Sequence, residues 1–168
     1  MFAENDLNIV KNPGETRIID VDDRTTSSEP ATLKPGEPVI IGGAGTNFAT
    51  RLLNGAPIVN SERLAGIVRK ESTETSSANG KVEVTTILPY QSVIRGTMNT
   101  AGNCDTAAEL LGIMYDWITF DWDATNYTID ENEGTDHTTR GLCVVAGDIG
   151  KTTLDVIVHD HCVEGGSL

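Results

Sequence analysis

Residues 64–98 constrain the fold most, because they carry the clearest strand pattern in the chain. In the middle of this stretch, the sequence KVEVTTIL alternates Val82 and Val84 with the charged residues Lys81 and Glu83. A period of two places the two sets on opposite faces of a strand, whereas a helix would need a period of 3.6. The stretch therefore predicts a half-buried β-strand.

Two further strands flank this one. LAGIVRK (residues 64–70) is rich in apolar and β-branched residues, and SVIRGTM (residues 92–98) begins soon after Pro89. The polar segment between the first two strands ends in Asn79-Gly80. That dipeptide readily adopts the positive φ angles of a tight hairpin. We therefore expect a three-stranded unit whose first turn lies at Asn79-Gly80.

Composition and one local motif complete the expected fold class. Hydrophobic residues make up 38% of the 168 residues and aromatic residues only 5%, so the core must be aliphatic. Thr106 and Glu109 have the spacing of a capping box, and apolar residues follow at helical spacing. We expect a mainly β protein, a small β-barrel or β-sandwich, with one α-helix over about residues 106–117.

The domain organisation follows from changes in composition. Residues 1–32 contain only two short apolar runs, and we expect them to form an extended N-terminal arm. The arm is expected to pack on a neighbouring subunit or partner, the alternative being that it folds back on its own domain. Residues 33–163 form the expected β-rich domain, either as one barrel or as two lobes (33–98 and 104–163). Residues 164–168 form an expected flexible tail.

The charge of the chain is strongly negative and unevenly distributed. Residues 1–98 contain 10 Lys/Arg and 12 Asp/Glu, whereas residues 99–168 contain 2 and 13. Proteins that bind nucleic acid need Lys and Arg to neutralise phosphate, so we expect no nucleic-acid partner. The distribution instead suggests a nearly neutral half that docks and an acidic half that faces water.

Targeting signals and disulfide patterns are not evident in the sequence. The N-terminus has neither the basic start nor the apolar run of a signal peptide, and no stretch is long and apolar enough to span a membrane. The three cysteines (Cys104, Cys143 and Cys162) are odd in number and scattered. We expect free, partly buried thiols in a protein made in the cytosol, with no membrane partner.

Two clusters contain residue types that bind metals. The first is an acidic stretch whose oxygens suit Ca²⁺, although Asn126 stands where a helix–loop–helix calcium site needs glycine: Asp121, Asp123, Asn126, Asp130, Glu131 and Glu133. The second is His159, His161 and Cys162, in which the two histidines would share one face of a strand but lack a third and fourth ligand nearby. We expect a solvated acidic loop and a polar strand end, and no bound metal.

Motifs for catalysis or nucleotide binding are incomplete. Gly150-Lys151-Thr152 resembles the end of a phosphate-binding loop, but Val145 occupies the position of the required glycine and a strand follows. We expect a hairpin turn there. The sequence contains no Gly-x-Ser-x-Gly nucleophile motif. We therefore expect neither enzymatic activity nor a cofactor.

Several stretches resemble head decoration (cement) proteins of tailed bacteriophages. They are LKPGEPVIIG, LAGIVRKESTETSSANGKVEV and NYTIDENEGTDHTTRGLCVVAGDIGKTTLDVIVH, within residues 33–160. These proteins share a Gly-x-Pro-Val strand opening, a polar loop ending in "NGKV" or "DGKV", and a late "tID" strand. The resemblance implies a β-rich protein of the outer capsid surface that bridges neighbouring capsomers. It also implies the major capsid protein and further copies of the chain, as a homotrimer, as partners.

The expected localisation is the outer surface of a virion, after synthesis in the bacterial cytoplasm. A strongly acidic protein would be repelled from packaged DNA, so the outer shell suits it better than the interior. The hairpin and the arm lie in the nearly neutral half, and we expect them to face the capsid, with the acidic half outward. The residues expected to contact partners are apolar residues of the arm and cations of the hairpin: Phe2, Leu7, Ile9, Val10, Arg69, Lys70 and Lys81.

Two alternatives remain open from the sequence. One is an extracellular β-sandwich that binds glycans or surfaces through Trp117, Trp122 and Tyr127. The other is a small acidic hydrolase with a metal ion bound between residues 121 and 133.

Overall fold

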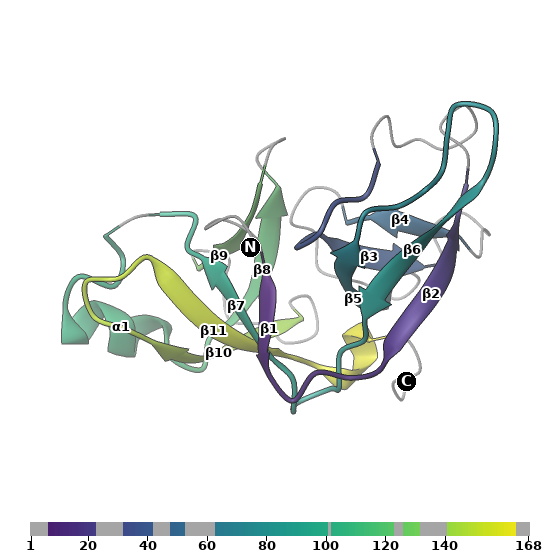
Figure 1. Cartoon of the computed structure of the whole chain (residues 1–168). Helices are drawn as coiled ribbons and strands as arrows, with labels where there is room; N and C mark the ends of the chain where they lie inside the picture. The colour runs from purple at the N-terminus through teal and green to yellow at the C-terminus, as the bar shows by residue number, and fades with distance from the viewer. Residues whose placement is uncertain are drawn as a thin grey trace.

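The computed structural model of the chain describes residues 7–22, 32–41, 48–52, 63–100, 102–122, 126–131 and 141–163. Within these ranges the protein is mainly β, as predicted, with one short α-helix. The strands form two antiparallel sheets that lie side by side (Figure 1).

Sheet A has six strands in the order β1 (Asn8–Lys11), β7 (Val93–Thr97), β11 (Thr153–Val158), β10 (Leu142–Gly147), β8 (Trp117–Trp122) and β9 (Tyr127–Asp130). Sheet B has five strands in the order β2 (Thr16–Val21), β6 (Gly80–Thr85), β5 (Arg63–Lys70), β3 (Pro38–Ile41) and β4 (Ala49–Arg51).

Both sheets curl strongly. In sheet A, β9 returns to β7, where Met98 and Ile129 form an isolated bridge and the Asn99 N–H donates to the Ile129 carbonyl at 2.8 Å. In sheet B, the edge strands β2 and β4 also contact each other. Neither sheet is closed by a continuous ladder in the described residues, so the architecture matches a β-sandwich better than a closed barrel.

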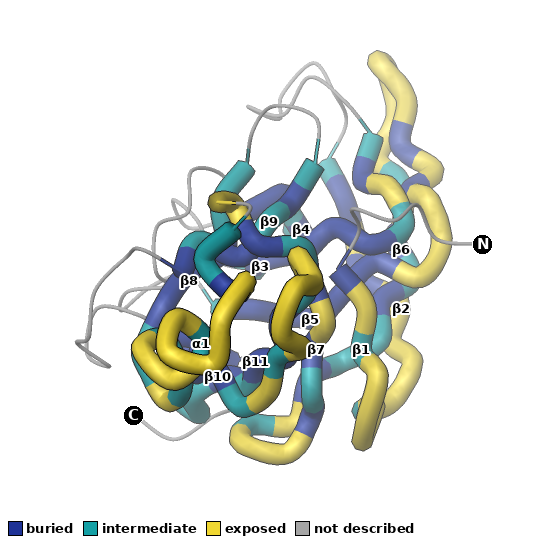
Figure 2. The backbone as a smooth tube through the Cα atoms, turned by 90° about the vertical axis from the view of Figure 1, so that its left-hand side faces the viewer, coloured by how far each residue is buried: buried dark blue, intermediate teal, exposed yellow. Residues whose placement is uncertain are grey.

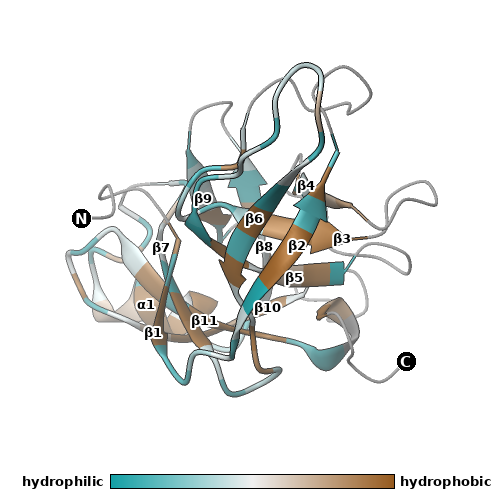
Figure 3. Cartoon of the chain, turned by 45° about the vertical axis from the view of Figure 1, so that its right-hand side comes forward, coloured by the Kyte–Doolittle hydropathy of each residue, from teal (hydrophilic) through white to brown (hydrophobic). Residues whose placement is uncertain are grey.

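Two aliphatic cores hold the molecule together. The larger one lies between the sheets, since Ile40, Leu64 and Ile67 of sheet B share it with residues of sheet A such as Ile94 and Ile118. The smaller core is enclosed by the other face of curled sheet B. Strands β3 and β5 are consequently hydrophobic along most of their length (Figure 3).

The three strands expected in residues 64–98 are confirmed as β5, β6 and β7. Val82 and Val84 are fully buried, and Lys81 is exposed, as the alternation predicts. The predicted turn is wrong, however. The chain reverses at Ser76-Ser77, between the bridged residues Thr75 and Ala78.

Gly80 has a different role from the one expected. It opens β6, and a Cβ atom there would lie only 2.0 Å from the backbone nitrogen of Glu74. The glycine is therefore required by close backbone packing and not by a positive φ angle.

The N-terminal segment differs from the expected arm. Residues 7–22 follow the β6–β7 segment in antiparallel direction across both sheets: β1 pairs with β7, and β2 pairs with β6. Between the two pairs, the Gly14 N–H donates to the Thr86 carbonyl and the Ser92 hydroxyl donates to the Asn12 carbonyl. This part of the segment belongs to the folded domain, which is the alternative left open above.

The two sheets also do not divide the chain at residues 33–98 and 104–163. Strand β7, which the first lobe should contain, belongs to sheet A together with β8–β11. The chain passes from sheet B to sheet A between β6 and β7. It also passes between the sheets earlier, because the consecutive strands β1 and β2 belong to sheet A and sheet B. The expected flexible tail, 164–168, lies outside the described residues.

The expected helix is α1 (Ala107–Ile113), and its capping box is confirmed. The Thr106 hydroxyl accepts from the Glu109 N–H at 3.2 Å, and the Glu109 carboxylate accepts from the Thr106 N–H at 2.8 Å. The helix is shorter than predicted, because Tyr115 has a φ angle of 67° and the chain turns into β8. Trp117 therefore belongs to a strand.

Candidate functional site

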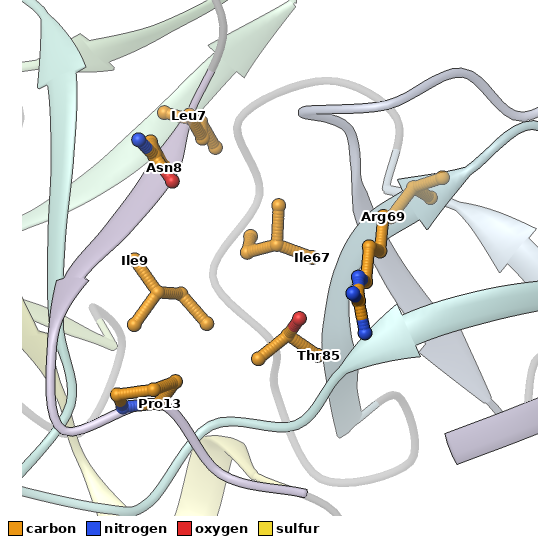
Figure 4. Close-up of a pocket in the computed structure, with 8 residues that line it drawn as sticks. Leu7, Asn8, Ile9, Pro13, Ile67, Arg69 and Thr85 are labelled. Carbon is orange, nitrogen blue, oxygen red and sulfur yellow. The ribbon is translucent and has the colours of Figure 1, made fainter. Parts of the chain in front are cut away.

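A small pocket lies between the two sheets, where β1 faces β5 and β6 (Figure 4). Its volume is about 100 Å³, and its lining is mainly apolar. Ile9 and Ile67 face each other across it, and Arg69 lies on the β5 side (Figure 4). Sites for drug-sized ligands measure about 300–1,000 Å³, so this pocket suits a single side chain rather than a small molecule.

The exposed face of β2, β6 and β5 adjoins this pocket. Arg69 donates to the Thr16 hydroxyl at 3.1 Å and lies 3.5 Å from the Glu83 carboxylate. Lys81 forms an exposed ion pair with Asp20 at 2.6 Å. Such exposed pairs contribute little to stability, about 0–1 kcal/mol, so these side chains remain available for other contacts.

One apolar residue stands among these charges. The side chain of Ile18 on β2 is 63% exposed, and its register partner on β6 is Glu83. A single exposed apolar residue is common on protein surfaces, so Ile18 does not by itself define a site. We refer to Ile18, Arg69, Lys70, Lys81 and Glu83 as the sheet B face.

The structure brings together several of the residues predicted to contact partners. Leu7, Ile9 and Arg69 line the pocket, and Lys70 and Lys81 lie on neighbouring strands. Leu7 is only 1% exposed and belongs to the core, so it is unsuited to direct partner contact. Phe2 lies outside the described residues.

Within the described residues, the acidic stretch belongs to two paired strands, β8 and β9, whereas Asp123 and Glu133 of the predicted cluster lie outside them. Asp121 lies opposite Thr128, and Asp130 lies opposite Thr119. Glu131 is buried, and its carboxylate accepts from the N–H groups of Asn99 and Thr100 and from the Asn103 side chain. This carboxylate therefore holds the loop before α1.

In the histidine cluster, His159 lies among aromatic rings, whereas the side chain of His161 is outside the described part of the structure. Nδ1 of His159 lies 2.6 Å from Oδ1 of Asp160, and the ring of His159 lies between those of Tyr90 and Trp117, at 4.9 and 5.3 Å. The Tyr90 hydroxyl donates to Asp160 at 3.3 Å. Desolvation and the Asp160 carboxylate raise the pKa of Tyr90, so this hydroxyl stays protonated at neutral pH.

Within the described residues, no group of three His, Cys, Asp or Glu side chains is arranged to hold a metal ion. All three cysteines are buried, and none of these described residues forms a disulfide. Burial raises the pKa of Cys162 to about 12, which keeps it a thiol rather than a reactive thiolate.

The aromatic residues considered for glycan binding do not form an open platform. Tyr127 is buried, and its hydroxyl donates to the Leu52 carbonyl at 2.6 Å. The Trp122 ring packs on Tyr127 at 4.6 Å and on the guanidinium of Arg51 at 4.9 Å. These contacts join β8 and β9 to β4, and so have a structural role between the sheets.

Sequence reasoning missed a buried ion pair at this junction. Arg51 and Glu37 are each less than 10% exposed, and the guanidinium donates to both carboxylate oxygens, at 2.9–3.2 Å. The charges are 14 residues apart on strand β4 and in the loop before β3, so local sequence gave no signal that they would pair.

Within the described ranges, no helix has the length and apolar character needed to cross a membrane. No protein-family model, curated protein or solved structure matches the chain.

Proposed function

We propose that this chain is a structural protein that binds the outer surface of an icosahedral phage capsid. In this role it bridges neighbouring capsomers and stabilises the shell. The proposal rests on the resemblance to head decoration proteins and on one structural observation, the separation of charge between the two ends of the molecule.

The uneven charge of the sequence gives the folded molecule one acidic end and one nearly neutral end. The exposed cations Arg17, Arg69, Lys70 and Lys81 belong to sheet B. Glu15, Asp20 and Glu71 are exposed on or beside the same strands, so this end is close to neutral. The far end of sheet A, around α1, instead carries exposed carboxylates such as those of Asp105, Glu109 and Asp148. Figure 1 shows that β2 and α1 lie at opposite ends of the molecule.

This polarity supports an oriented attachment. A negatively charged surface repels the acidic end more strongly than the nearly neutral sheet B face, which favours one orientation during encounter. Paired charges around the exposed Ile18 also suit a modest, reversible contact. On a lattice, many such contacts act together, so that weak individual binding becomes strong overall.

The proposed mechanism is mechanical and needs no chemical step. A protein that binds only the expanded shell lowers the free energy of that state by mass action. Each bound copy that touches two capsomers also opposes their separation. The shell should therefore become more resistant to heat as its sites fill.

The test is cosedimentation of the purified chain with empty expanded heads of the phage that encodes it. We expect saturable binding at a fixed number of copies per capsomer and a higher temperature of shell disruption. Bovine serum albumin, also an acidic protein, serves as the control for non-specific pelleting. Absence of saturable binding, or binding with no change in shell stability, would contradict the proposal.

A further inference from the structure

Helix α1 presents an apolar face to the outside of the molecule. Leu110, Ile113 and Met114 pack against the core. The exposed positions lie on the other side of the helix, and all but Glu109 are apolar: Ala107, Ala108, Leu111 and Gly112. A surface helix normally carries polar residues on that side, so this face differs from an ordinary solvated one.

The exposure of this face is large. The side chain of Leu111 is 74% exposed, and that of Tyr115, just after the helix, is 71% exposed. Figure 2 shows the tube around α1 as mostly exposed. Adjacent large apolar residues on a surface mark a site of protein contact more often than isolated ones do.

The charges beside this face limit what can cover it. Asp105 and Glu109 are both exposed next to the apolar residues. If two copies met with their α1 helices against each other, these carboxylates would come together. Like charges at an interface are costly. The covering surface should therefore combine an apolar depression with a positive charge.

The pocket between β1 and β5 has both properties. Ile9 and Ile67 make it apolar, and the Arg69 side chain lies at its edge. This side chain is 58% exposed, and its contact with the Glu83 carboxylate at 3.5 Å is an exposed pair that another carboxylate can replace. Its volume of about 100 Å³ is of the size of one aliphatic side chain; for comparison, apolar cavities of about 150 Å³ hold a benzene molecule.

The helix and the pocket of one chain lie apart. Figures 1 and 3 both show α1 at the end of sheet A that is remote from β5. An intramolecular contact is thus impossible without unfolding. The complementary pair of surfaces can meet only between two copies.

We propose that the chain associates head to tail, with Leu111 of one copy inserted between Ile9 and Ile67 in the pocket of the next. Arg69 of the receiving copy then lies close to Asp105 and Glu109 of the inserted helix. Such a contact is heterologous, so repetition produces a closed ring or a filament rather than a two-fold dimer. The inference does not depend on attachment to a shell.

Sedimentation velocity over a range of concentrations provides the first test. The wild-type chain should form a larger species as concentration rises, and Leu111→Ser and Arg69→Glu should each remain monomeric under the same conditions. Ile149→Ser is the matched control, since Ile149 is also exposed (54%) but lies in the β10–β11 turn. A wild-type chain that stays monomeric at several hundred micromolar, or Leu111→Ser that associates normally, would overturn the proposal.

Directed disulfide formation tests the head-to-tail geometry. The native cysteines are all buried, so an added surface thiol can be read without interference. A mixture of Leu111→Cys and Asn8→Cys chains, one carrying a mass tag, should give a mixed covalent dimer under mild oxidation. Asn8 is an exposed residue of the pocket lining. A Leu111→Cys chain that cross-links efficiently to itself would show a two-fold contact and overturn the head-to-tail geometry.

Discussion

At the scale of residues, the buried pair of Arg51 and Glu37 joins three parts of the protein. The guanidinium contacts the Glu37 carboxylate, the Thr32 carbonyl and the face of Trp122. Glu37 also accepts from the Lys34 N–H at 3.0 Å. Both charges thus keep hydrogen-bond partners after removal from water, which is the condition for a buried pair to be tolerated.

Replacement of only one partner should be strongly destabilising. Arg51→Met leaves the Glu37 carboxylate buried without its counter-charge, and we expect a loss of about 3–5 kcal/mol in the free energy of unfolding. The double variant Arg51→Met/Glu37→Met should lose much less, because no charge stays buried alone. Urea denaturation of both variants measures this, and equal losses would contradict the assignment.

The buried thiol of Cys162 should make stability depend on alkaline pH. Burial raises its pKa from 9.0 to about 12, and Asp160 adds to this effect. Between these values the folded state holds a proton that the unfolded state has released, so the free energy of unfolding falls as pH rises from about 9 to about 12. Below pH 9 this group contributes no pH dependence.

The variant Cys162→Ala isolates this contribution. Its free energy of unfolding should decline less steeply above pH 9 than that of the wild type, whatever constant loss the smaller side chain causes. Cys104→Ala is the comparison, because the pKa of Cys104 is also raised, mainly by desolvation. Parallel curves for Cys162→Ala and the wild type would show that the thiol titrates normally.

At the scale of elements, β1 is attached to sheet A by a packing contact as well as by hydrogen bonds. Leu7 is buried beside Gly96 of β7, where a Cβ atom would lie 2.6 Å from the Leu7 side chain. Glycine at position 96 therefore makes room for the leucine that precedes β1. This contact explains how a short edge strand is held in place.

Leu7→Ala should consequently destabilise the whole domain by about 2–5 kcal/mol, the usual range for a buried leucine. Val10→Ala is the control in the same strand. Because Val10 is 38% exposed, this variant should lower the free energy of unfolding by only about 0.5 kcal/mol. Thermal and urea unfolding provide the measurement. Equal, small effects for both variants would mean that the segment is not part of the domain.

At the scale of the whole molecule, the sequence predicted what short-range patterns determine. The alternation of Val82 and Val84 identified β6, and the spacing of Thr106 and Glu109 identified the start of α1. It did not predict that residues 7–22 would pair along β6 and β7. That pairing connects residues 59 to 87 positions apart, and nothing within the segment itself encodes it.

The candidate site followed the same rule. Arg69, Lys70 and Lys81 are close in sequence, and their shared location was predictable from a hairpin. The pocket could not be predicted, because it forms only where β1 of sheet A faces β5 and β6 of sheet B. The apolar exposed face of α1 also escaped notice, since Leu111 fits a helical pattern whether it points inward or outward.

The central claim is that the sheet B face attaches the protein to a capsid with the acidic end pointing away. Lys70→Glu and Lys151→Glu change the net charge equally and both replace exposed lysines, one on sheet B and one near α1. In cosedimentation with expanded heads at low salt, Lys70→Glu should bind at least about tenfold more weakly, because like charges at an interface cost several kcal/mol. Lys151→Glu should bind as the wild type does. Undiminished binding of Lys70→Glu, or loss of binding only in Lys151→Glu, would contradict the claim.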